Sequence, residues 1–400
     1  MSRTSQRTKH LGTENAFVVL QEVNELAAQG RDINSFCIGQ PDFDTPDHIR
    51  LAGIRAITEG KTGYTPSSGI PELREAIARY LSETREIEVS PDSVVVANGA
   101  KPFIMYSIVS VTDYGAGEEV LFPNPGFPIY EAQTEAHGAV SVSLPLRRRH
   151  AFGIDMDDLR RNVNERSRLL ILNSPQNPTG RLLIEEELKE IAEIVLPYED
   201  LWVYSDEVYS RMVYDGAFKS IASIPGMEER TILVDGASKT YAMTGWRIGY
   251  AANKSLAGYF SRWVTNTDSC AGHLSQWAAL EALTGPQDPS ERMVQVFRRR
   301  RDLIVEGLNE IEGITCLSPG GAFYVWPDVT EACNLVGAAD SEDFRKRLLY
   351  QAGVAVLSDI HFGPKIPGEG EHIRFSYATS DEHIKEGLSS IAEYIRKHRR

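Results

Sequence analysis

Three short apolar segments in the middle of the chain each lead directly into polar residues, and this feature limits the possible folds more than any other. The segments are residues 168–172 before Asn173, residues 201–204 before Asp206, and residues 231–234 before the loop that contains Lys239. Apolar runs of this length that are bounded by turn signals are typical of strands buried on both faces. Helix-like segments separate these runs, so the sequence predicts an α/β fold with a largely parallel sheet.

The polar residues after these segments predict a single binding site. In open α/β sheets the ligand crevice lies outside the C-terminal ends of the strands. Two further predicted strands, 93–97 and 119–123, also end in turn-forming residues. A helix is predicted at 70–84, because Pro71 stands in its first turn and leucine and isoleucine residues follow at helical spacing.

The length of the chain and a change of pattern near residue 290 predict two domains. A chain of 400 residues exceeds the size at which one hydrophobic core usually suffices. We predict a large α/β domain at 46–290 and a smaller α+β domain that combines 1–45 with 291–400. The smaller domain would begin its C-terminal part with a long charged helix at 291–311. Short segments of strand character follow at 322–326, 354–357 and 373–377.

Charge and composition exclude several classes of function. The net charge of −14 argues against broad binding of nucleic acid or of anionic membranes, because a phosphate backbone would be repelled. The four cysteines form no C-x-x-C pair and the nine histidines no H-x-x-x-H pair, so we expect reduced thiols and no metal site. No apolar run approaches the roughly 20 residues that span a bilayer, and residues 1–10 lack the apolar core of a signal peptide. We therefore expect a cytoplasmic protein.

Several residues near the predicted strand ends suit a reactive site, although each has a simpler interpretation on its own. Lys239 lies eight residues before Arg247, and a second cation nearby lowers the pKa of an amine and makes it nucleophilic. Taken singly, Lys239 would be a solvated lysine and Asp206 an acidic helix start. Residues 177–180 (Asn-Pro-Thr-Gly) would be a turn, and Phe127 a core aromatic.

Taken together, these motifs resemble those of the class I and II aminotransferases of fold type I, in the aspartate aminotransferase superfamily. The motifs, in chain order, are Asn-Pro-Thr-Gly at 177–180, Asp206-x-x-Tyr209, Ser238-Lys239 and Arg247. The likeness covers nearly the whole chain, from Gly-Gln-Pro-Asp-Phe-Asp-Thr-Pro at 39–46 to His-Ile-Arg-Phe-Ser at 372–376. The resemblance implies a fold type I architecture and pyridoxal 5′-phosphate as the cofactor. It also implies an enzyme that moves an amino group from an L-amino acid to a 2-oxo acid by a ping-pong mechanism.

The resemblance assigns five residues to the ring of the cofactor. Lys239 would form the Schiff base and move a proton between the substrate α-carbon and the C4′ atom of the cofactor. Asp206 would pair with the pyridine nitrogen and keep it protonated, because the protonated ring is the electron sink of the reaction. Tyr209 and Asn177 would bind the phenolic oxygen, and Phe127 would stack on the ring.

A second set of residues is assigned to the phosphate of the cofactor. Arg247 would bind it as a charge-assisted pair, and Ser238, Gly99 and Ala100 would add backbone or hydroxyl donors. Tyr64 would reach the phosphate of the partner subunit's cofactor. A homodimer with shared active sites is therefore part of what the resemblance implies.

Arg374 is the residue expected to bind the α-carboxylate of the substrate. Alternation along 373–377 places Arg374 opposite an apolar face, where an arginine is usually solvated. The resemblance implies instead that its guanidinium binds the carboxylate through two parallel hydrogen bonds, which a lysine cannot reproduce. The backbone of Gly39 and the side chain of Asn177 would contribute to the same subsite.

Lys101 is the residue expected to determine the amino donor. A subgroup of bacterial and archaeal aspartate aminotransferases has a lysine here that meets the distal carboxylate of aspartate or glutamate, with 2-oxoglutarate or oxaloacetate as acceptor. Two departures leave other donors open. The chain continues Lys-Pro-Phe at 101–103 instead of Gly-Lys-Gln, and residues 12–17 do not match the usual entry segment. Otherwise Lys101 would be a solvated lysine at a helix start.

Other functions on the same fold also remain open. Aromatic, prephenate or alanine-type specificity would keep most of the motifs. A β-lyase, decarboxylase or racemase would retain Lys239, Asp206 and Arg247, and would differ in which bond to the α-carbon is held perpendicular to the ring. A non-enzymatic regulator would require an attached DNA-binding module, for which we expect no room before Thr13.

Overall fold

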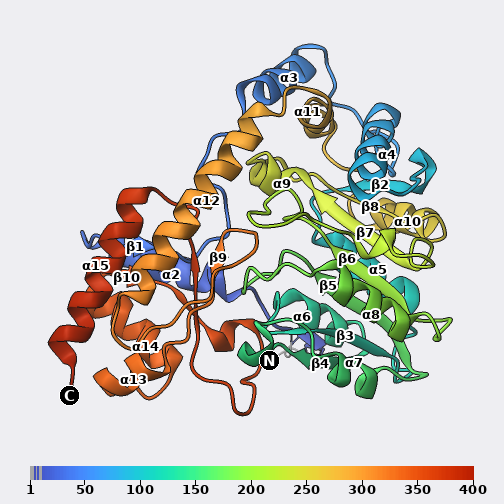
Figure 1. Ribbon diagram of the computed structural model, residues 1–400. Coiled ribbons are helices and arrows are strands. Elements are labelled where there is room, and N and C mark those ends of the chain that lie inside the picture. Colours follow the sequence, from blue (N-terminus) through green and yellow to red (C-terminus); the bar gives the residue numbers. More distant parts are fainter. Residues whose placement is uncertain (1–3, 6, 9–10) are drawn as a thin grey trace.

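A seven-stranded sheet forms the centre of the molecule and appears in Figure 1 with its strands in the order β2-β8-β7-β6-β5-β3-β4. The computed structural model describes residues 4–5, 7–8 and 11–400. Residues 1–3, 6 and 9–10 lie outside the described part of the chain. They belong to the N-terminal segment for which no signal peptide is predicted. The strands of the sheet are β2 (Val94–Ala97), β3 (Glu119–Asn124), β4 (Val140–Pro145), β5 (Ser167–Asn173), β6 (Trp202–Asp206), β7 (Thr231–Gly236) and β8 (Gly249–Ala252).

The sheet is mostly parallel, which confirms the predicted fold class. Neighbouring strands from β4 to β7 pair in parallel, whereas β8 runs antiparallel to both β7 and β2. Its inner strands bury apolar side chains on both faces. In β5, Leu169 and Ile171 pack toward one layer of helices, and Leu170 and Leu172 pack toward the other. Each such side chain contributes about 1.5–3 kcal/mol on burial.

Helices cover both faces of this sheet. One layer contains α5 (Pro102–Val111), α6 (Ile129–Ala136) and α10 (Ala257–Thr267), and the other contains α4 (Pro71–Arg85), α7 (Met156–Asn162), α8 (Glu185–Val195) and α11 (His273–Thr284). The predicted helix at 70–84 is therefore α4. Two more helices complete this part of the chain: α3 (Asp47–Thr58), which packs on α11, and the short α9 (Ala237–Thr240), which follows β7.

The C-terminal part of the chain forms a second group of elements. In Figure 1 the long helix α12 (Asp288–Asn309) runs from the side of α3 and α11 into this group. The group contains α13 (Thr330–Val336), α14 (Ser341–Arg347), α15 (Asp381–His398), β9 (Tyr324–Val325), β10 (Val354–Ala355), β11 (Leu357–Ser358) and β12 (Ile373–Ser376). At the N-terminus, β1 (Asn34–Ser35) pairs in parallel with β10, and α2 (Asn15–Ala28) packs against the same elements. The assignment of 1–45 and 291–400 to one domain remains a prediction.

The segment of strand character predicted at 354–357 is divided between two strands. Ala355 belongs to β10 and pairs with β1, whereas Leu357 belongs to β11 and pairs with Arg374 of β12 in a separate three-stranded sheet. The chain changes hydrogen-bonding partners between the two, so one apolar run supplies two short strands. The predicted segment 322–326 likewise contains a strand of two residues, β9.

Two observations concern the compartment and the thiols. Within the described residues, no helix is both long enough and apolar enough to cross a membrane. The four cysteines, all in the described part of the chain, are unpaired; three are buried, and Cys270 is partly exposed.

Candidate functional site

A cavity of about 490 Å³ lies at the C-terminal ends of β5, β6 and β7. Asn173, Asp206 and Gly236, the last residues of these strands, all line it. Lys239 in α9 and Arg374 in β12 reach the same cavity. The side chains that follow the three apolar segments therefore come together, at the place where the parallel sheet predicts a ligand crevice.

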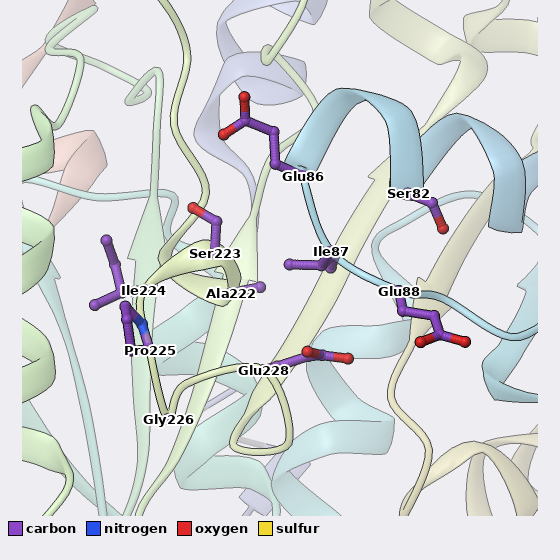
Figure 2. A pocket seen from close by; sticks show the side chains of 10 residues that line it. All are labelled: Ser82, Glu86, Ile87, Glu88, Ala222, Ser223, Ile224, Pro225, Gly226 and Glu228. Atoms are coloured by element: carbon purple, nitrogen blue, oxygen red, sulfur yellow. The ribbon is translucent and has the colours of Figure 1, made fainter.

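A second hollow, shown in Figure 2, lies between the C-terminal end of α4 and residues 222–228, and it does not suit an anionic ligand. Glu86 and Glu88 follow α4, and Glu228 lies on the loop opposite. These carboxylates would repel a phosphate or a carboxylate. We therefore place the candidate site at the strand ends.

Lys239 has the properties of a reactive amine. It is partly buried, and its Nζ donates a hydrogen bond to the backbone oxygen of Gly39. Burial lowers the pKa of Lys239 to about 8; the carboxylate of Glu14 opposes this shift, and the guanidinium of Arg374 adds to it. A pKa of about 8 leaves about a tenth of the amine in its neutral, nucleophilic form at pH 7, far more than an ordinary lysine has.

Asp206 is a buried carboxylate at the end of β6. Its Oδ2 accepts a hydrogen bond of 2.6 Å from the hydroxyl of Tyr130. Burial raises the pKa of Asp206 to about 6, and the Tyr130 hydroxyl counteracts part of that rise. Because β5 and β7 pair with β6 on either side, the carboxylate is fixed relative to Lys239 by the sheet itself.

Arg374 is buried, and this rules out the interpretation of a solvated strand arginine. The residue is 3% exposed, and its guanidinium carbon lies over the rings of Tyr324 and Phe362, at 4.5 and 4.8 Å from their centroids. One Nη donates to Asn177 Oδ1 at 2.9 Å, and the other donates to the backbone oxygen of Cys37. The Nε atom has no hydrogen-bond partner in the described part of the chain. A buried N–H without a partner is costly, so it marks a place for an acceptor such as a carboxylate.

Tyr209 and Phe127 also line the cavity. The hydroxyl of Tyr209 lies 2.7 Å from the hydroxyl of Tyr324, which in turn packs against the backbone of Gly39. A side chain at Gly39 would collide with Tyr324, so this close approach requires glycine.

The residues assigned to the phosphate are only partly brought together. Arg247, Ser238 and Ala100 line the cavity, whereas Gly99 does not. Gly99 has φ +98°, and a Cβ at this position would collide with the guanidinium of Arg247. It therefore acts by letting Arg247 approach the backbone. Tyr64 is 88% exposed and lies outside the cavity of its own chain.

Lys101 lies at the mouth of the cavity and is engaged by another side chain. Its Nζ is 2.6 Å from Glu14 Oε2 and 5.2 Å from the centroid of the Phe127 ring. The Lys101 side chain is 45% exposed and that of Glu14 is 25% exposed. Lys101 is therefore an exposed lysine at the start of α5, as its simpler interpretation has it, and it is also paired with Glu14.

Among the residues that were not predicted from the sequence, Tyr130, Tyr324 and Glu14 make side-chain hydrogen bonds or ion pairs in the cavity. Tyr130 carried no signal, because a tyrosine in a helix is usually a core residue. Tyr324 falls in the predicted strand at 322–326, where it was not distinguished from its apolar neighbours. Glu14 falls in the segment 12–17, whose departure from the usual pattern was the available signal.

Behind the cavity, a buried ionic cluster holds the strand ends in place. Arg85 at the end of α4 donates from Nε to Glu207 and from Nη2 to Asp235, each at 2.8 Å. The three side chains are 1–3% exposed. Glu207 directly follows Asp206, and Asp235 lies four residues before Lys239. The Arg85 cluster therefore ties together the two strands that carry the reactive side chains.

Comparisons with known proteins agree with this geometry. A sequence profile of the family described as "Aminotransferase class I and II" matches residues 31–391. The chain is 40% identical over 401 residues to the "Probable aspartate/prephenate aminotransferase" of Aquifex aeolicus, with 98% of each chain covered. The aspartate aminotransferase structure from Rhizobium meliloti matches with a TM-score of 0.92 at 32% identity, covering 99% of both chains. An alanine aminotransferase structure from Pyrococcus furiosus matches with a TM-score of 0.90 at 30% identity, covering 99% of this chain and 100% of that one.

Within the described residues, no group of three or more histidine, cysteine, aspartate or glutamate side chains has the arrangement of a metal site.

Proposed function

The chain belongs to the class I and II aminotransferase family, is an aminotransferase and uses pyridoxal phosphate; we propose that its amino donor is aspartate or another dicarboxylic L-amino acid. The acceptor would be a 2-oxo acid such as 2-oxoglutarate, in a ping-pong mechanism. The observation that carries the proposal is the convergence on one cavity of the Lys239 amine, the buried Asp206 carboxylate and the buried Arg374 guanidinium. A second cation, Lys101, lies at the mouth of that cavity.

The residues of the cavity fit the cofactor in their chemistry. Pyridoxal phosphate requires an amine, an acid for its ring nitrogen and donors for its phosphate. Lys239 supplies an amine whose pKa is lowered to about 8, and Asp206 supplies a carboxylate beside it. Arg247 and Ser238 supply the phosphate donors. Bound pyridoxal phosphate supplies an electron sink that stabilises negative charge at the α-carbon of the substrate.

We assign the proton transfer to Lys239. As a neutral amine it accepts the proton from the substrate α-carbon, and as an ammonium group it returns the proton. The Asp206 carboxylate holds a proton on the ring nitrogen of the cofactor by charge, and the Tyr130 hydroxyl fixes the orientation of that carboxylate. Tyr209 and Asn177 are assigned to the phenolic oxygen, and Phe127 to the face of the ring.

We assign the α-carboxylate of the substrate to Arg374. The unpaired Nε and one Nη of the guanidinium form the fork that a carboxylate matches. Asn177 holds the guanidinium in place, because its Oδ1 accepts a hydrogen bond of 2.9 Å from Nη1 of Arg374. The backbone of Gly39 completes this subsite.

The dicarboxylate specificity rests on Lys101, which we assign to the distal carboxylate of the donor. An alternative has its own support. The Lys101 ammonium is paired with Glu14, and an already paired lysine favours a donor with a neutral side chain, of the alanine or aromatic type. A different reaction on the same fold, such as a β-lyase, would use the same residues around the ring.

We also propose a cytoplasmic homodimer with shared active sites. The helix α3 exposes Leu51, Ile54 and Ile57, and Tyr64 follows that helix almost fully exposed. An apolar patch of this kind is typical of a subunit interface. Tyr64 would then reach the phosphate in the partner subunit. The unpaired cysteines support a reducing compartment.

The test is a panel of amino donors with the holoenzyme and 2-oxoglutarate, read as ratios of kcat/KM, because specificity is a ratio of those values. We expect aspartate and glutamate to exceed alanine and phenylalanine, and initial rates to give the parallel double-reciprocal lines of a ping-pong mechanism. A higher kcat/KM for a neutral donor would replace the dicarboxylate assignment. Formation of ammonia and a 2-oxo acid without any acceptor would replace transamination by a lyase reaction.

A further inference from the structure

The ion pair between Glu14 and Lys101 spans the mouth of the cavity. Glu14 immediately precedes α2 at the N-terminus, and Lys101 immediately precedes α5 in the large α/β part. Both residues line the cavity, and their charged atoms are 2.6 Å apart. The chain thus places one of its own carboxylates on the lysine that is assigned to the substrate.

We infer that Glu14 is a specificity-determining residue, whose carboxylate competes with the distal carboxylate of a substrate for Lys101. The inference rests on the proposed function, since it concerns the donor subsite of the same cavity. Its consequence is a donor preference that is much flatter than a free lysine would give. Dicarboxylic donors have to displace Glu14, whereas neutral donors leave the pair in place.

The position of Glu14 supports a role outside its own helix. It stands at the N-cap of α2, where a side-chain oxygen commonly accepts a backbone N–H of the first turn. Its carboxylate makes no such bond. It points instead at a residue 87 positions away in the sequence. The side chain is therefore fixed by the cavity and not by the local helix.

The position of Lys101 explains why an anion is held there. A cation at the N-terminus of a helix faces the positive end of the helix dipole, which is unfavourable. Lys101 occupies this place at the start of α5. The face of the Phe127 ring and the carboxylate of Glu14 both offset the unfavourable field. Either Glu14 or a substrate carboxylate can supply the anion.

When a substrate carboxylate replaces Glu14 on Lys101, the Glu14 carboxylate is left without a cation. It also stays close to a second negative charge. Loss of Glu14 removes both the competition and this repulsion. Since Lys101 and Glu14 are partly exposed, we expect an effect of about tenfold and not of several hundredfold.

The test compares aspartate with asparagine, which has nearly the same shape but no distal charge. The holoenzyme is mixed with one donor and no acceptor, and the first half-reaction is followed by the absorbance of the cofactor. The variants are Glu14→Gln, Lys101→Met and the double variant. We expect Glu14→Gln to raise the aspartate/asparagine ratio of apparent second-order rate constants about tenfold, and Lys101→Met to lower it. The double variant should not show the increase.

A binding measurement gives a readout that does not depend on turnover. Succinate carries a distal carboxylate and butyrate does not, and neither can react. We expect Glu14→Gln to tighten succinate binding about tenfold by calorimetric titration, with little change for butyrate. Glu25→Gln is the matched control, because Glu25 is an exposed carboxylate of the same helix and lies outside the cavity.

The outcomes separate this inference from the proposed function. The two readouts are the aspartate/asparagine ratio of rate constants and the succinate/butyrate ratio of affinities. If Glu14→Gln leaves both ratios unchanged while Lys101→Met lowers them, Glu14 does not compete for Lys101, and the dicarboxylate assignment stands. If Glu14→Gln lowers the rate constants for aspartate and asparagine by the same factor, Glu14 only positions the N-terminal segment, and the inference fails. If Lys101→Met changes neither ratio, Lys101 does not bind a distal carboxylate, and the inference fails together with that assignment.

Discussion

The two sides of the cavity differ in how firmly their charges are held. On the strand-end side, formed by Asp206, Lys239 and the Arg85 cluster behind them, the ionic side chains of the cluster are at most 3% exposed and are bound to more than one partner. On the mouth side, formed by Glu14, Lys101 and Phe127, the side chains of the Glu14–Lys101 ion pair are 25% and 45% exposed.

With the proposed residue roles, this difference would separate the chemistry common to all donors from the choice of donor. Buried charges cannot be rearranged without large cost, so the strand-end side keeps one geometry for every substrate. A partly exposed pair exchanges partners at little cost, so the mouth side can adapt. A change on the strand-end side should therefore affect all donors equally, and a change at the mouth should affect donors differently.

Loss of the Lys239 amine should have the largest effect. With the roles proposed for Lys239, Lys239→Ala would remove both the covalent attachment of the cofactor and the group that moves the proton, so we expect kcat to fall by about 10⁴-fold with every donor. The measurement is steady-state turnover with aspartate and alanine, together with borohydride reduction and mass spectrometry of the cofactor linkage. Lys254→Ala, at an exposed lysine, is the control. A loss confined to dicarboxylic donors would contradict the separation of the two sides.

Loss of Arg85 should destabilise the fold. Arg85→Met leaves Glu207 and Asp235 buried without their cation, and we expect the free energy of unfolding to fall by about 3–5 kcal/mol. Urea unfolding of the holoenzyme measures the change. Arg299→Met breaks an exposed ion pair with Asp381, and there we expect less than about 1 kcal/mol. Similar losses in the two variants would show that the Arg85 cluster does not act as a buried unit.

Arg374→Lys should lower kcat/KM by a similar factor for every donor. Lysine keeps the charge but cannot form two parallel hydrogen bonds to the α-carboxylate, so we expect kcat/KM to fall by about 100-fold for aspartate and alanine alike. The ratio of the two losses is the informative quantity. A ratio far from one would move Arg374 from the α-carboxylate to the distal group.

The sequence predicts the strand-end side well, because that side depends on local patterns. An apolar run followed by a polar residue specifies both a buried strand and the position of its end. The predicted segments 168–172 and 201–204 therefore fall within one or two residues of the bounds of β5 and β6. The parallel order of these strands then brings Asp206 and Lys239 into one cavity without any further information.

The other contacts depend on residues far apart in the chain, and no local pattern reports them. Arg85 follows the predicted helix at 70–84 and would normally be an exposed charge, yet its partners lie 122 and 150 positions away. Glu14 meets Lys101 across 87 positions. A charged side chain has the same local signature whether it faces solvent or another element, so only the fold distinguishes the two.

The smallest effect we expect is an electrostatic coupling between the two sides through Lys239. Its pKa is lowered from 10.5 to about 8, chiefly by burial, while the nearby carboxylate of Glu14 acts in the opposite direction. The neutral amine is the form that captures pyridoxal phosphate. The rate at which the cofactor-free protein captures the cofactor is divided by the rate for Nα-acetyl-lysine, which corrects for the titration of the cofactor. A plot of this rate ratio against pH should bend near pH 8, and below that pH the ratio should be well above one.

Glu14→Gln removes an anion that favours the protonated amine, so the bend should move to lower pH by a fraction of a unit. Glu25→Gln should leave it unchanged, because that carboxylate does not line the cavity. The shift should shrink at high salt, since the Glu14 side chain is partly exposed and its field is screened. An unchanged bend in Glu14→Gln would mean that the mouth selects donors without any influence on the reactive amine, and the two sides would then be electrostatically independent.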